Sequence, residues 1–211
     1  GTAPHSSGPG GRLAADGTLE MGGDGLPQGR VLFAAEPDGR ISGTATFADY
    51  AAGTARLALT PVRFTYAPGG RGRVTTVMTL DGPLPDGALS GLTVPVDAVL
   101  LPGGSVRLAG DCVPVRWRSL RLSSLSLDPA NVRLCGISDG EMRLAETRLT
   151  GRLGGSPLAF SAASARYGLG SGQFELAAPD VRIGPSDNPV RLAAARLVGQ
   201  VGSTASGIAG T

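Results

Sequence analysis

The sequence predicts an all-β fold, and three observations support this prediction. The chain of 211 residues contains 34 Gly and 16 Pro, and both residue types disfavour long helices. Hydrophobic residues make up 41% and charged residues 17%, which is not the composition of a disordered chain. From Val31 onwards, short runs of alternating apolar and polar residues are separated by turn signals, as in half-buried strands. The length allows one domain or two small ones.

The chain divides into three regions by composition. Residues 1–29 lack hydrophobic periodicity, so we expect a flexible Gly- and Pro-rich segment there. A β-rich segment follows over 30–201, and the small residues of 202–211 predict a flexible end. The strands expected in the β-rich segment are 31–35, 40–48, 54–66, 73–80, 88–100, 105–109, 113–127, 130–135, 141–152, 157–167, 172–183 and 190–201.

These strands place apolar residues on one face and polar residues on the other. Phe174 and Leu176, for example, share a face that excludes Glu175, because successive side chains of a strand alternate. The connections are short, which favours antiparallel meanders. Two segments are the best helical alternatives, but Gly53 interrupts 47–58, and 190–198 lacks a clean apolar stripe.

The most regular stretch is 115–134, in which apolar pairs recur every five residues. One interpretation is a pentapeptide-repeat-like β-solenoid. The other is a series of short strands whose phase is reset by bends or bulges. We favour bends, because a solenoid needs many coils and only about four repeats are present.

Two cysteines, Cys112 and Cys135, bracket this stretch. They cannot complete a zinc site with the single histidine, His5, so we expect no metal. A disulfide between them would stabilise the fold by about 3–4 kcal/mol and would imply an oxidising compartment. The alternative is a pair of buried, reduced thiols.

The sequence offers little support for catalysis or nucleic-acid binding. A nucleophile–His–acid triad would have to use His5, and Asp139 with Glu141 is more typical of a hairpin turn than of an acid–base pair. The net charge of +2 is too small to indicate a nucleic-acid partner. Arginines surround Trp117, and such a strand could contact lipid headgroups or nucleic acid, although solvated arginines are the commoner outcome. We therefore expect a non-enzymatic protein without a cofactor.

Four segments carry a resemblance to a known family. They are Gly110-Asp111-Cys112-Val113-Pro114-Val115, Leu120-Arg121-Leu122, Leu125-Ser126-Leu127 and Val132-Arg133-Leu134-Cys135. They resemble the YdbH family, large AsmA-like envelope proteins of Gram-negative bacteria that are related in architecture to TamB. The resemblance covers about residues 30–201. Family members typically have Pro after the second Cys, where this chain has Gly136.

The resemblance implies both a fold and a role. It implies an elongated, curved antiparallel sheet that forms a groove. The family is anchored in the inner membrane and crosses the periplasm, and the groove is thought to carry phospholipid towards the outer membrane. Contacts with the two membranes would then involve segments not present here, and an envelope protein partner is possible. The chain starts at Gly1, so we expect it to be a segment of a longer protein. The family brings no catalytic residues.

The alternating apolar residues around the cysteines are the predicted lipid-binding lining of this groove. They are Val115, Trp117, Leu120, Leu122, Leu125, Leu127, Val132 and Leu134. The alternative is a structural or adhesive β-solenoid or sandwich that binds a protein partner. A continuous apolar face open to solvent would favour lipid, and a sealed core would favour the structural role.

Overall fold

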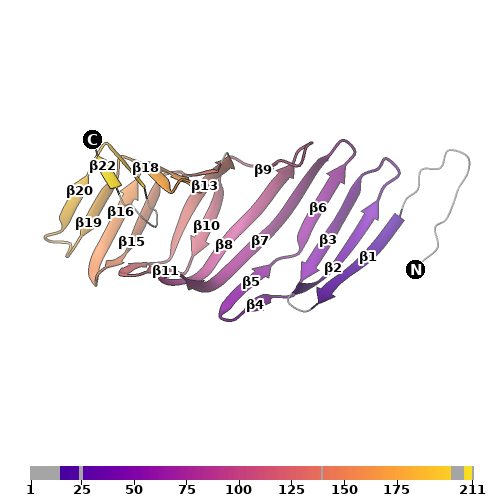
Figure 1. The fold of residues 1–211 in the computed structure, drawn as a ribbon, viewed down its shortest axis with the longest axis horizontal. Helices are drawn as coiled ribbons and strands as arrows, with labels where there is room; N and C mark the ends of the chain where they lie inside the picture. Colours follow the sequence, from indigo (N-terminus) through magenta and orange to yellow (C-terminus); the bar gives the residue numbers. More distant parts are fainter. Residues whose placement is uncertain (1–14, 24–25, 139, 201–206, 211) are drawn as a thin grey trace, which may run out of the picture. The chain divides into compact units, whose positions relative to one another are not determined.

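The computed structural model describes residues 15–23, 26–138, 140–200 and 207–210, and every helix-or-strand element among them is a strand (Figure 1). Each resolved strand register is antiparallel, as in the pairing of β2 with β3 and of β15 with β16. The predicted all-β, antiparallel class is therefore confirmed. In this part of the chain, no helix is long and apolar enough to cross a bilayer.

The chain forms two compact units. The first contains Gly1–Ala52, Arg56–Met78 and Pro95–Ala109, and the second contains Gly53–Ala55, Thr79–Val94 and Gly110–Thr211. Strands of the first unit are β1 (Ala15–Gly23), β2 (Leu26–Ala35), β3 (Ile41–Phe47), β4 (Tyr50–Ala52), β6 (Val62–Ala67) and β9 (Val106–Leu108). Strands β5 (Ala55–Leu59), β7 (Arg71–Leu84) and β8 (Gly87–Leu100) contribute residues to both units.

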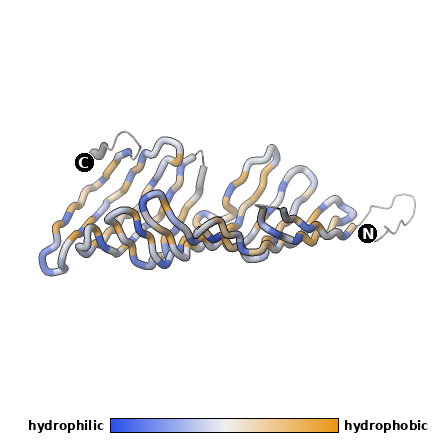
Figure 2. Tube along the Cα trace, turned by 60° about the horizontal axis from the view of Figure 1, so that its bottom comes forward, coloured by the Kyte–Doolittle hydropathy of each residue, from blue (hydrophilic) through white to orange (hydrophobic). Residues whose placement is uncertain are grey.

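The first unit contains a meander in the order β1–β2–β3–β6–β7. Directly opposed residues share a face, so its registers collect most of the apolar side chains on one face. One row across the strands is Leu19, Val31, Ala45 and Val62, and the next is Gly17, Phe33, Gly43, Phe64 and Val74. Figure 2 shows the resulting alternation of hydrophobic and hydrophilic residues along the strands.

The second unit is a sheet with two arms. The first arm runs in the order β11 (Ser119–Leu122), β12 (Leu125–Leu127), β15 (Thr147–Leu153), β16 (Ser156–Ala162), β19 (Asp180–Ile183) and β20 (Val190–Ala193). The second arm runs in the order β10 (Val113–Trp117), β13 (Ala130–Ser138), β14 (Glu141–Leu144), β17 (Ser164–Gly168), β18 (Gln173–Ala177), β21 (Arg196–Gln200) and β22 (Gly207–Gly210).

The two arms are joined along a bend line, because each long stretch of chain supplies one strand to each arm. Only one or two residues connect the two halves of each stretch: 118, 128–129, 145–146, 163, 178–179 and 194–195. The bend begins in β8, where Gly91 has φ +62°. Residues before Gly91 pair with β11, and Thr93 pairs with Arg116 of β10.

This bend line explains the five-residue spacing seen in the sequence. The apolar pairs of 115–134 fall on β10, β11, β12 and β13 in turn, and a bend or a hairpin turn resets the alternation between them. The strands of both arms pair antiparallel with their neighbours. Of the two alternatives, short strands separated by bends are therefore confirmed, and the β-solenoid is not. The curvature that was predicted for the sheet is this bend of the second unit.

Two expectations about local structure are wrong. The segment 1–29 was expected to form a loop, but it contains β1 and the start of β2. Its glycines suit these strands because Phe33 lies over Gly17 and Phe47 over Gly29. Within the predicted C-terminal end, 207–210 forms β22. Residues 1–14, 201–206 and 211 lie outside the described residues.

Candidate functional site

All eight residues of the predicted lining lie on the apolar faces of the two arms. In the second arm, Val115 is opposite Val132, Trp117 is opposite Ala130, and Leu134 is opposite Val113. In the first arm, Leu120 is opposite Leu127 and Leu122 is opposite Leu125. The sequence pattern therefore identified residues that the strand registers bring together.

The apolar face extends well beyond these eight residues. In the first arm, Leu127 continues through Gly151, Leu158 and Ile183 to Val190, and a parallel row contains Leu149, Phe160, Val181 and Leu192. In the second arm, Leu134 continues through Leu144, Ala165 and Leu176 to Leu197. The alternation of each strand carried this signal, but the sequence alone could not assign strands to arms.

Burial shows that the apolar faces lie on the inside of the bend. The buried apolar side chains of the second unit include Leu127 of the first arm and Val132 of the second, which are 8% and 6% exposed and stand on either side of the bend line. Ala162 and Thr147, next to the same line, are also buried. The opposite side of the bend carries exposed side chains such as those of Arg118 and Glu146. A sheet without a second layer can bury side chains in this way only where its arms cover each other.

The apolar face opens to solvent at the hairpin ends of the strands and at the edge strand β20. Leu122 and Leu153, at the hairpin ends of the first arm, are 39% and 37% exposed, and Leu192 on the last strand of that arm is 61% exposed. No large side chain among the described residues is fully buried. The face is thus buried along the bend line at β12, β13, β15 and β16, and accessible at the hairpin ends and at the edge strand β20.

Trp117 belongs to this apolar face and not to a basic cluster. Its indole Nε1 donates a hydrogen bond to the carbonyl oxygen of Asp128, 3.1 Å away, at the bend. The neighbouring Arg116 lies on the opposite face by strand alternation, and Arg118 binds Asp81. Arg116 and Arg118, the sequence neighbours of Trp117, therefore do not form a basic cluster around its indole ring.

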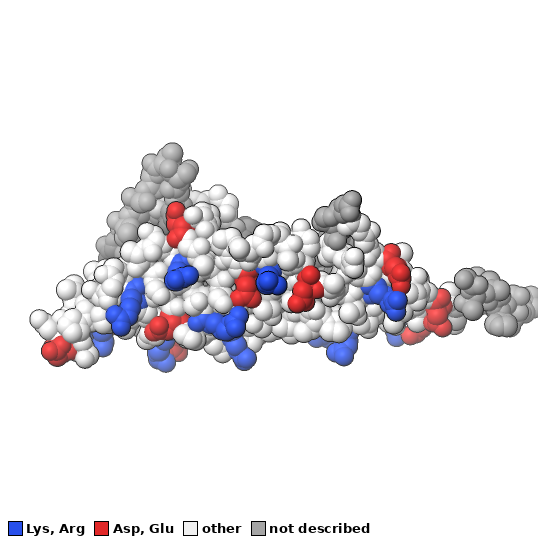
Figure 3. All heavy atoms as spheres, turned by 90° about the horizontal axis from the view of Figure 1, so that it is seen from below, with Lys and Arg blue, Asp and Glu red and all other residues white. Residues whose placement is uncertain are grey.

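The polar face of the second unit carries most of the unit's arginines, several paired with carboxylates of neighbouring strands. Arg196 binds Glu175 through two hydrogen bonds of 2.9 Å, and Arg191 and Arg182 both contact Asp180. The hydrogen bond from Arg196 lowers the pKa of Glu175, and that from Arg191 lowers the pKa of Asp180. Charged side chains of both signs are visible on the surface in Figure 3. Most strands of this unit thus separate a polar, often charged face from an apolar one.

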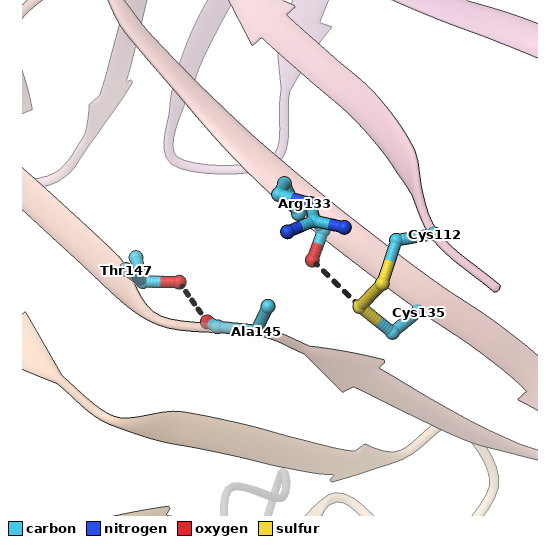
Figure 4. Close-up of a disulfide and its surroundings, with 5 residues drawn as sticks. All are labelled: Cys112, Arg133, Cys135, Ala145 and Thr147. Atoms are coloured by element: carbon cyan, nitrogen blue, oxygen red, sulfur yellow. Dashed lines mark hydrogen bonds between the residues drawn. A yellow bond between two sulfur atoms is a disulfide. The ribbon is translucent and has the colours of Figure 1, made fainter.

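Cys112 and Cys135 form a disulfide, as one of the two alternatives predicted (Figure 4). The bond joins β13 to the residue preceding β10, next to the opposed pair Val113 and Leu134. Strand alternation places the two cysteines on the polar face. Gly136 follows with φ +88° at a register shift of β13. Proline cannot adopt this angle, whereas glycine can.

The first unit also presents an apolar face with little cover. Ala45 and Ala98 are its buried apolar residues, while Leu19, Met21, Phe33 and Tyr66 are exposed. Its opposite face carries ion pairs, including Glu20 with Arg30 and Asp97 with Arg73. Both units therefore share the separation of an apolar from a charged face.

No protein-family model, curated protein or solved structure matches the chain. Among the described residues, no cluster of His, Cys, Asp and Glu could hold a metal ion. The function must therefore be argued from the geometry of the apolar face.

Proposed function

We propose that this chain is a non-enzymatic segment of a periplasm-spanning, AsmA-like envelope protein that transports or shields phospholipid on its apolar face. The observation that carries the proposal is the apolar face of the second unit, which is buried along much of the bend and open at the hairpin ends and at the edge strand β20. Leu120, Leu127, Leu158 and Ile183 form one of its continuous rows. Acyl chains are the ligand class that such rows suit, because they need no polar partner.

The energetics are those of hydrophobic transfer. Each CH₂ group of an acyl chain that is removed from water contributes about 0.8 kcal/mol. An acyl chain with a few methylenes against each side chain of the face would therefore be bound stably. The aliphatic side chains and the small residues Gly151 and Ala165 offer a surface without directional contacts. Such a surface allows chains to slide, which a transport path requires.

The wider role rests on the resemblance to the YdbH family. Attachment to the inner membrane, passage across the periplasm and delivery to the outer membrane belong to that resemblance and to segments outside this chain. The disulfide supports an oxidising compartment. The sheet geometry supports a path for acyl chains, and together these features favour a lipid role over catalysis.

The test is lipid extraction and mass spectrometry on the chain expressed in a bacterial periplasm and purified without detergent. We expect stoichiometric phospholipid. The variant Leu122→Asp with Leu192→Asp, at exposed positions of the apolar face, should lose it while remaining folded by circular dichroism. Ala159→Asp, on the polar face of β16, is the matched control and should retain it.

A folded protein without lipid would overturn the proposal. Specific capture of an envelope protein by such lipid-free protein would favour the alternative, a structural or adhesive module.

A further inference from the structure

Two arginines flank a serine on the polar face of the first arm. Arg121 of β11 is opposite Ser126 of β12, and Ser126 is opposite Arg152 of β15. Neighbouring strands lie about 4.8 Å apart, so the Cα atoms of the two arginines are roughly 10 Å apart. Serine is a small residue, and two arginine side chains at this separation are long enough to reach one ligand above it.

Arg121 and Arg152 differ from the other arginines of the first arm in that they contact no carboxylate of the described residues. Arg148, Arg182 and Arg191 each contact a carboxylate. Among the described residues, neither Arg121 nor Arg152 has a carboxylate within 4.0 Å. Arg152 donates only to the carbonyl oxygen of Gly155, at 3.0 Å. Two positive charges therefore flank one serine, and no carboxylate of the described residues neutralises them.

The site also lies at the edge of the apolar face. Leu122 and Leu153, each one residue from an arginine of the site, belong to the apolar face and are opposed through Leu125. The turns beyond them consist of Ser123 with Ser124 and Gly154 with Gly155. Only small side chains therefore separate the two arginines from exposed leucines, and an amphipathic ligand could contact both across this edge.

We propose that Arg121, Ser126 and Arg152 bind the phosphate of a phospholipid headgroup whose acyl chains lie on the apolar face. This inference rests on the proposed function and deepens it. A phosphodiester shares one negative charge between two non-bridging oxygens, to which a planar guanidinium can donate two parallel hydrogen bonds. The serine hydroxyl supplies a further donor.

A similar pair in the first unit lacks two of these features. Arg40 and Arg71 line a hollow of about 340 Å³ on either side of Ala67. However, Arg40 already has Asp38 at 3.9 Å, and alanine offers no donor. We therefore assign the phosphate site to the first arm of the second unit.

The test compares two ligands that differ only in the phosphate-containing headgroup. Binding of short-chain phosphatidylglycerol and of diacylglycerol with the same acyl chains is measured on the full chain without detergent. We expect about tenfold tighter binding of the phospholipid, the factor that corresponds to 1.4 kcal/mol. In R121Q/R152Q both ligands should bind with the affinity of diacylglycerol. The control R116Q/R133Q, on the polar face of the second arm, should behave as the wild type.

The possible results separate this inference from the proposed function. Equal binding of both ligands by the wild type, or an unchanged preference in R121Q/R152Q, would overturn the phosphate site and leave the acyl-chain surface standing. Failure of the wild type to bind either ligand would overturn both. Inorganic phosphate is measured alone as a third probe. If inorganic phosphate binds the wild type as tightly as the phospholipid does, and this binding is lost in R121Q/R152Q, the site binds free phosphate and the headgroup assignment is wrong.

Discussion

Single residues of the first unit show why glycine can be favourable inside these strands. Aromatic rings lie over glycines of the neighbouring strand, as Phe64 does over Gly43. Glycine normally weakens a strand, and the covering ring compensates by filling the space of the missing side chain. This is why the glycines of residues 15–23 wrongly predicted a loop where the chain forms β1.

The variant Gly43→Ala tests this packing. A Cβ atom at Gly43 would lie 2.5 Å from Cζ of Phe64 and would also press on the carbonyl oxygen of Leu32. We expect a loss of about 1–3 kcal/mol in the free energy of unfolding, measured by urea denaturation. Gly110 has open space and no positive φ, so Gly110→Ala should leave stability within about 0.5 kcal/mol. Equal effects of the two variants would contradict the account.

Asp81 gives the start of the bend a pH dependence. Its carboxylate accepts hydrogen bonds from the Gly91 amide at 2.7 Å, the Ser90 hydroxyl at 3.0 Å and Arg118 at 3.1 Å. These contacts, the Gly91 amide first, lower the pKa of Asp81. Because the folded pKa lies below the unfolded value, the stabilisation is complete above about pH 4 and is lost as the pH falls towards the folded value.

We therefore expect Asp81→Asn to be less stable than the wild type at neutral pH. The difference should shrink as the pH falls below about 4. Urea unfolding at a series of pH values measures this. A stability difference that stays constant over the same range would show that Asp81 does not stabilise the bend through its charge.

At the scale of elements, the bend line determines what the sequence could reveal. The apolar pairs of 115–134 predicted short strands with phase resets, and the structure confirms them. The assignment of alternate halves to two arms was not predictable, because it depends on pairings such as Leu127 with Gly151. The disulfide was predictable only as one of two alternatives, since bonding requires that β10 and β13 be neighbours.

The bend can be tested at two alanines. Ala178 joins β18 to β19 with φ +45°, whereas Ala163 joins β16 to β17 without a positive φ. A positive φ is costly for alanine but not for glycine, so Ala178→Gly should raise the free energy of unfolding by about 1 kcal/mol. Ala163→Gly should lower it by about 0.5–1 kcal/mol. Urea denaturation of both variants is the measurement, and the same sign for both would contradict the bend geometry.

The disulfide gives a second prediction for the elements. It closes a loop between residues 112 and 135, for which the chain-entropy estimate is about 3–4 kcal/mol. We expect the double variant Cys112→Ser/Cys135→Ser to lose stability of this order in urea. The wild type with a reductant should match it. A double variant as stable as the oxidised wild type would show that pairing of β10 with β13 does not need the bond.

At the scale of the whole molecule, both units repeat one design. Each presents an apolar face with few buried side chains and a charged face with cross-strand ion pairs. The sequence predicted the alternation and eight of the apolar residues. It could not decide between an open face and a sealed core, because leucine, valine and alanine serve both. The exposure of Leu122, Leu153 and Leu192 favours the open face.

The central claim is that acyl chains occupy the apolar face, and strand alternation provides the most direct test. A photoreactive diazirine amino acid is placed at Leu158, Ala159, Phe160 or Ser161 of β16, which alternate between the apolar and the polar face. Irradiation in the periplasm of a Gram-negative host, followed by mass spectrometry, reports any phospholipid adduct. We predict adducts at positions 158 and 160 and none at 159 and 161. Equal labelling at all four positions, or at none, would contradict the account.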